Sequence, residues 1–147
     1  IGEKAFYNCK KFKLEFPNNS KLEIIEKESF GSLSIESFDL PTSVIQISEY
    51  AFINCKNMKR IGIPNNSQLQ IIEPDAFSST MITCFSVPRH VKYINGNAFN
   101  QCNNLQIIEF EEESEIKSLY PQDFEGFKLI MVPRNLSHFF ENALGFN

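Results

Sequence analysis

An Ala-Phe dipeptide that recurs about every 23 residues constrains the fold of this chain more than any other feature. A period of this length is typical of solenoids, in which each unit buries its apolar face only against its neighbours. The copies, including those in which one residue is replaced, are Ala5-Phe6, Ser29-Phe30, Ala51-Phe52, Ala76-Phe77, Ala98-Phe99, Asp123-Phe124 and Ala143-Leu144.

Each unit also carries a short alternating segment, apolar–x–apolar, which is the pattern of a half-buried strand. Pro follows this segment in five of six units, and because Pro has no N–H to donate, it marks the end of the strand. We expect the aromatic residues to stack with a spacing of roughly 5 Å, one strand separation. The predicted strands are 14–16, 38–40, 61–63, 85–87, 108–110 and 130–132.

A longer period overlies the short one. The distance from the residue that follows each strand to the next aromatic alternates between 13 and 11 residues. Residues 17–63 and 64–110 therefore align as two copies of a double unit, with the sequence Pro-Asn-Asn-Ser at the start of both. The predicted fold is a β-rich repeat solenoid of about six repeats of 22–25 residues, alternately long and short.

The segment from Ile47 to Pro64 resembles the BspA-type leucine-rich repeat, also called the LRR_5 class, almost letter for letter. The resemblance extends over nearly the whole chain and weakens after Lys117. It implies a right-handed leucine-rich solenoid from a secreted or cell-surface protein of an anaerobic bacterium or mucosal protist, used in adhesion and binding. It also implies an extracellular location.

The 147 residues form one predicted domain, 1–147, with 42% hydrophobic residues. No apolar run approaches the roughly 20 residues of a membrane span. Ile1 lies inside a repeat, and neither end carries a polar cap, a signal segment or an anchor. We therefore expect a fragment of a longer chain, with uncapped ends that allow self-association.

Three of the four cysteines, Cys9, Cys55 and Cys102, occupy the same repeat position in alternate units. Two coils are about 10 Å apart, which exceeds the roughly 7 Å Cα separation of a disulfide. We expect these thiols to be free and buried, and Cys84 to lie on a different side of the coil. No zinc-ligand spacing is present, so no metal or other cofactor is predicted.

No catalytic constellation is apparent, and the chain is predicted not to be an enzyme. His90 and His138 lie in turns without a partner at a motif spacing. The acidic run 109–115 is either a calcium site or a solvated turn, and we favour the turn because its spacing matches no calcium loop. A net charge of −4 argues against nucleic acid as a partner.

In each strand the residue between the two apolar positions points outward, as does the residue before the strand, so stacked strands present one exposed array. Its C-terminal end is apolar, and is either an interaction patch or a face covered by further chain. The residues of this array are Lys13, Glu15, Ser37, Asp39, Arg60, Gly62, Cys84, Ser86, Ile107, Glu109, Leu129 and Met131.

Three N-glycosylation sequons begin at Asn18, Asn65 and Asn135, and all three are expected in turns. Two of them, Asn18 and Asn65, occupy matched positions of the double unit.

Three functions are compatible with these features. The first is an extracellular adhesion module that binds a host, matrix or cell-surface protein through the exposed array. The second is a structural spacer that projects another domain, and the third is an intracellular protein-interaction scaffold. The repeat by itself does not choose among them, because a fold does not fix a function.

Overall fold

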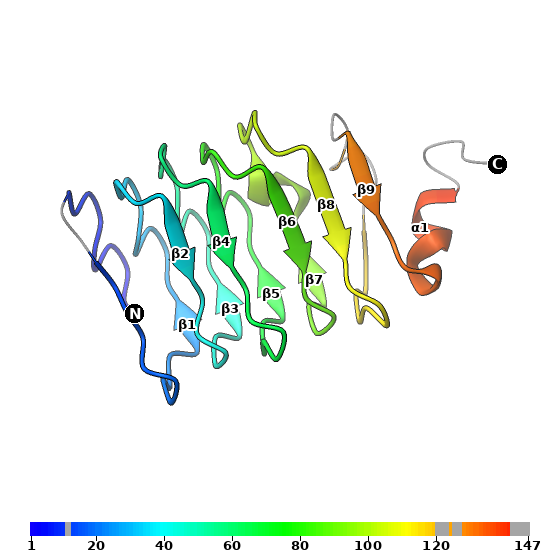
Figure 1. Cartoon of the computed structure of the whole chain (residues 1–147), viewed down its shortest axis with the longest axis horizontal. Helices are drawn as coiled ribbons and strands as arrows, with labels where there is room; N and C mark the ends of the chain where they lie inside the picture. Colours follow the sequence, from blue (N-terminus) through cyan, green and yellow to red (C-terminus); the bar gives the residue numbers. More distant parts are fainter. Residues whose placement is uncertain (11–12, 120–123, 125–127, 142–147) are drawn as a thin grey trace.

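The computed structural model describes residues 1–10, 13–119, 124 and 128–141 and shows a solenoid of stacked coils (Figure 1). One narrow parallel sheet runs along one side of the stack, in the order β1-β3-β5-β7. Each of its strands has two residues: β1 (Ile24–Ile25), β3 (Gln46–Ile47), β5 (Ile71–Ile72) and β7 (Tyr93–Ile94).

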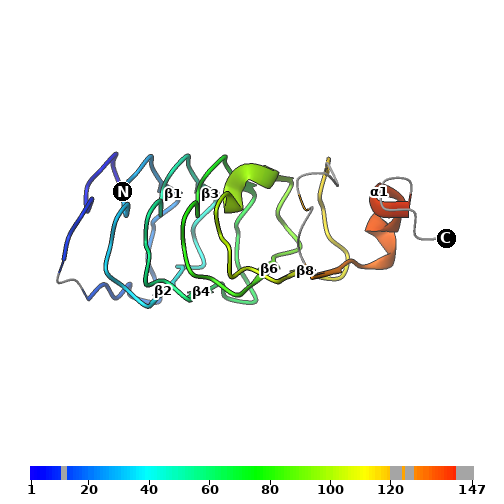
Figure 2. The ribbon, with the colours of Figure 1, turned by 90° about the horizontal axis from the view of Figure 1, so that it is seen from above.

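The opposite side carries the longer strands, also parallel (Figure 2). Here β2 (Ser37–Asp39) pairs with β4 (Arg60–Gly62), and β6 (Cys84–Val87) pairs with β8 (Ile107–Phe110) and then β9 (Leu129–Met131). Little of the chain is helical: the described helices are η1 (Gly96–Phe99), η3 (Arg134–Leu136) and α1 (Ser137–Glu141).

These longer strands confirm five of the six predicted strand positions. β6 and β8 alternate exposed and buried residues strictly, because every second side chain of a strand points to the same face. The segment 14–16 is different, since no strand forms there. Among the described residues, no main-chain hydrogen bond joins 13–17 to the coil of β2, and Leu14 and Phe16 are only half-buried. Alternation of apolar residues therefore does not by itself produce a strand in this segment.

The predicted stack of aromatic rings is confirmed over five coils. Phe6, Phe30, Phe52, Phe77 and Phe99 lie nearly parallel, with centroid separations of 5.4, 5.4, 5.5 and 5.7 Å along the series. The sixth expected member, Phe124, is buried and packs edge-on against Phe110 at 6.1 Å. The position of Leu144 lies outside the described residues.

Rings from the long strands fill the remaining space beside the stack. Phe38 of β2 contacts both Phe30 and Phe52, at 4.9 and 4.8 Å. Phe85 of β6 sits in the same way between Phe77 and Phe99, at 5.5 and 4.9 Å. The buried phenylalanines of the described coils therefore belong to one continuous core.

The turns that hold the stack together have a left-handed backbone. In most coils the residues two before and two after the stacked Phe have φ between 52° and 59°, although none is glycine. In this conformation, three alternate N–H groups of one coil donate to three carbonyls of the next. Phe52 donates to Ala76 at 2.8 Å, and its neighbours Tyr50 and Asn54 donate to Pro74 and Ser78.

Among the described residues, no helix is long and apolar enough to cross a membrane.

Candidate interaction surface

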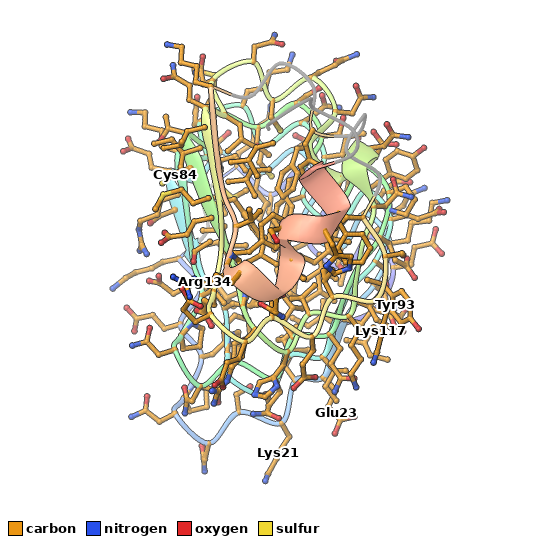
Figure 3. The ribbon with its side chains drawn as sticks, turned by 90° about the vertical axis from the view of Figure 1, so that its right-hand side faces the viewer. Lys21, Glu23, Cys84, Tyr93, Lys117 and Arg134 are labelled. Atoms are coloured by element: carbon orange, nitrogen blue, oxygen red, sulfur yellow. The ribbon has the colours of Figure 1, made fainter. Side chains whose placement is uncertain are left out.

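The long strands and the segment before them form one exposed surface, which we call the strand face. Its members are the predicted outward positions, of which Gly62 is half-buried and the others are exposed: Lys13, Glu15, Ser37, Asp39, Arg60, Cys84, Ser86, Ile107, Glu109, Leu129 and Met131. The ladder register aligns these positions within two sheets. On β2 and β4, Ser37 lies beside Arg60 and Asp39 beside Gly62. On β6, β8 and β9 one row runs through Cys84, Ile107 and Leu129, and the other through Ser86, Glu109 and Met131. Figure 3 shows Cys84 on this face and Tyr93 on the opposite side.

In the N-terminal half of the strand face the charged side chains pair with each other. Arg60 donates from Nη2 to Oδ1 of Asp39 at 2.7 Å, and Lys13 forms an ion pair with Glu15. Gly62 leaves the room for the first pair, because a Cβ there would lie 2.0 Å from Oδ1 of Asp39. This half therefore presents little uncompensated charge.

The C-terminal half is apolar. Ile107, Leu129 and Met131, which we call the apolar patch, are 37%, 48% and 45% exposed. Ile107 lies beside Leu129 in the ladder, and Glu109 lies beside Met131. Among the described residues, Glu109 has no ion-pair partner. Large apolar side chains gathered on a surface are characteristic of interaction sites.

The acidic turn 111–115 follows β8 and is held to the preceding coil. Oε2 of Glu111 accepts a hydrogen bond from the main-chain N–H of Arg89, and Glu115 donates its own N–H to the Arg89 carbonyl at 2.7 Å. Oε1 of Glu115 lies 2.9 Å from Nδ1 of His90. Because a carboxylate only accepts, Nδ1 carries the proton.

That hydrogen bond from His90 is the main cause that lowers the pKa of Glu115, with smaller contributions from the charges of His90, Lys92 and Lys117. His90 lies in a turn, as predicted, and its partner was not apparent from the sequence because the 25 residues between the two side chains amount to one coil. Among the described residues, no group of three or more His, Cys, Asp or Glu side chains is placed to hold a metal ion.

The cysteines are free, as predicted. Cys55 and Cys102 are buried, and their thiols donate to the carbonyls of Phe30 and Phe77 at 3.1 and 3.0 Å. Burial raises the pKa of Cys55 to about 11 and raises that of Cys102 as well. Cys9 is only half-buried, which corrects the expectation for that position, and Cys84 is exposed on the strand face.

Exposed apolar side chains also lie on the narrow sheet, at positions that were not predicted from the sequence. Tyr93 is 53% exposed and Ile24 is 43% exposed, and both occupy the outward position of a two-residue strand. The signal was present in the sequence, since the buried Ile of each unit is preceded by a residue that must point the other way.

The three sequons differ in their surroundings. Asn18 and Asn65 are exposed residues of turns, as predicted. Asn135 is exposed but lies in η3 rather than in a turn, and its Nδ2 donates to the carbonyl of Ser114 at 2.8 Å. This is the nitrogen to which a glycan would be attached.

A family model described as BspA type leucine rich repeat region matches six copies in this chain, over residues 1–106 and 70–145. No curated protein matches the chain in sequence. Two solved structures are similar. A leucine rich cell surface protein from Faecalibacterium prausnitzii A2-165 has a TM-score of 0.55 and 22% identity, over 80% of this chain and 37% of that chain.

The second structure, the pneumococcal vaccine antigen PcpA, has a TM-score of 0.48 and 17% identity, over 89% of this chain and 47% of that one. The chain thus spans less than half the length of either protein. At these identities the likeness concerns the fold.

Proposed function

Because the chain belongs to the BspA-type leucine-rich repeat family, we propose that it is a non-catalytic binding module of a secreted or cell-surface protein, and that it binds a protein through the strand face. The similar structure from Faecalibacterium prausnitzii is described as a cell surface protein, which supports this location.

One observation carries the choice of the strand face. On β2, β6 and β8 buried residues alternate strictly with exposed ones, so the exposed positions of these strands do not build the core. At the C-terminal end of the strand face the side chains of the apolar patch are exposed. Their contact with water costs free energy, and a partner that covers them removes this cost. A spacer that binds nothing has no need for such a patch.

The experiment compares binding of the wild-type chain and of an Ile107→Glu/Met131→Glu variant to host cells and to a panel of immobilised matrix proteins. A matched control carries Ile24→Glu/Tyr93→Glu, which places the same charges on the opposite side. We expect binding by the wild type and by the control, and its loss in the strand-face variant. Binding by none of the three chains would favour the spacer, and equal binding by all three would place the site elsewhere.

A further inference from the structure

The apolar patch and the carboxylates beside it form a surface with two chemical parts. Ile107 and Glu109 project from the same strand, two residues apart, and therefore lie roughly 6.6 Å from each other. Leu129 and Met131 flank them on β9. An apolar position and an uncompensated negative one thus follow each other along the strand direction.

The negative charge continues past the end of β8. Glu111, Glu112 and Glu113 come directly after the strand, and none of them has an ion-pair partner among the described residues. Arg89, the cation bonded to this turn, reaches Glu111 through its main-chain N–H alone. Lys128 precedes β9, at the end of the strands away from the acidic turn.

This arrangement contrasts with the other half of the strand face. There each carboxylate is already neutralised by a neighbour, Glu15 by Lys13 and Asp39 by Arg60. A charged partner gains little by approaching those pairs, because exposed ion pairs are weak and the charge is compensated. Charge complementarity therefore directs a cationic partner to the C-terminal half.

Resting on the proposed function, we infer that the partner presents an extended segment with an apolar side chain followed at alternate positions by Lys or Arg. A strand-like segment that lies along β8 repeats its side chains on one face with the same period as the patch. Its apolar side chain packs on Ile107 and Leu129, and its cations reach Glu109 and the carboxylates after the strand. The segment binds through side chains, since the main chain of β8 is paired on both sides.

The test uses three synthetic peptides and the intact chain. GTLTKTKTG carries the proposed pattern and GTLTETETG reverses its charge. GTLKTKTTG has the composition of the first peptide, but both of its Lys side chains lie on the opposite face from Leu. Methyl NMR titrations follow the signals of Ile107, Leu129 and Met131. We expect only GTLTKTKTG to shift all three. Glu109→Gln should weaken its affinity by about two- to fivefold, as for an exposed ion pair, whereas Glu23→Gln on the opposite side should not.

Other outcomes overturn the inference. Equal binding of GTLKTKTTG would mean unspecific attraction between a basic peptide and an acidic chain. Shifts with GTLTETETG, or shifts confined to other residues, would refute the charge pattern. Self-association through the patch in sedimentation, without peptide binding, would make a second copy the occupant. If no peptide binds while the Ile107→Glu/Met131→Glu variant still loses cell binding, the proposed function stands and this segment chemistry fails.

Discussion

At the residue scale, the stacked rings concentrate much of the stability of the chain in a few positions. Phe77 is fully buried and lies between two parallel rings, Phe52 at 5.5 Å and Phe99 at 5.7 Å. The ring of Phe85 covers it from the side at 5.5 Å. Three coils therefore meet at this one side chain.

Phe77→Ala is expected to lower the free energy of unfolding by about 3–5 kcal/mol, because it removes buried apolar surface and leaves a cavity between two coils. Chemical denaturation monitored by circular dichroism measures the change. Tyr93→Ala, which removes a half-exposed ring, is the control and should cost less than about 1 kcal/mol. Equal losses for the two variants would contradict the account of the core.

The left-handed turns give a second prediction. Ser32 has φ of 57°, whereas Ser34, two residues later, is not among the residues with positive φ. A β-branched side chain is strained in the left-handed region by about 1–2 kcal/mol. Ser32→Val should therefore lower the unfolding free energy by that amount, and Ser34→Val should leave it nearly unchanged. If both substitutions cost the same, the turn geometry is not the cause.

The reactivity of the cysteine thiols gives a third prediction. Only a thiolate reacts quickly with maleimides or disulfide reagents, and burial raises the pKa of Cys55 to about 11. In the native chain at pH 8, Cys84 should be labelled within minutes, while Cys55 and Cys102 should be labelled only after addition of denaturant. Mass spectrometry of peptides locates each label. Rapid native labelling of Cys55 would show that the core opens readily.

At the element scale, the hydrogen bond between His90 and Glu115 joins the turn after β8 to the turn after β6, one coil earlier. Since the pKa of Glu115 is lowered in the folded chain, the carboxylate stabilises the fold at pH values above its ordinary pKa of 4.5. This stabilisation is lost as the pH falls through the lowered pKa. It is small, because the pair is exposed to solvent.

The carboxyl carbon of Glu115 should accordingly titrate below the ordinary range in an NMR pH series. In a His90→Ala variant the midpoint should move back toward 4.5, because the main hydrogen-bond donor is lost. An unchanged midpoint in the variant would mean that His90 is not the cause.

The elements also show what the sequence could and could not predict. Strands at 38–40, 85–87 and 108–110 were predictable because alternation of apolar residues is a local signal. The failure at 14–16 depends on pairing with a neighbouring coil, which no local pattern reports. The left-handed turns were not predicted, because Lys, Glu and Tyr occupy positions where glycine is the usual signal.

At the candidate site, too, part of the arrangement could be predicted from the sequence and part could not. The outward positions of the strand face could be predicted from the period of two, and all of them except Gly62 are exposed. The contact between His90 and Glu115, the pairing of Asp39 with Arg60 and the room left by Gly62 all depend on which residues become neighbours one coil apart. That register is fixed by the alternating coil lengths.

At the scale of the whole molecule, the solenoid separates stability from recognition. Each coil contributes a ring to the core and an outward pair to the strand face, so changes on the face leave the stack intact. The same logic makes the face adaptable, because each outward position can vary without repacking the interior.

The most direct test of this separation is the thermal unfolding midpoint of the Ile107→Glu/Met131→Glu variant. Both side chains are exposed, and Glu is well solvated in their place. The variant should melt within a few degrees of the wild type while its binding to the partner is lost. A large fall in the midpoint, comparable to that of Phe77→Ala, would show that these residues belong to the core and would contradict the assignment of the strand face as the binding surface.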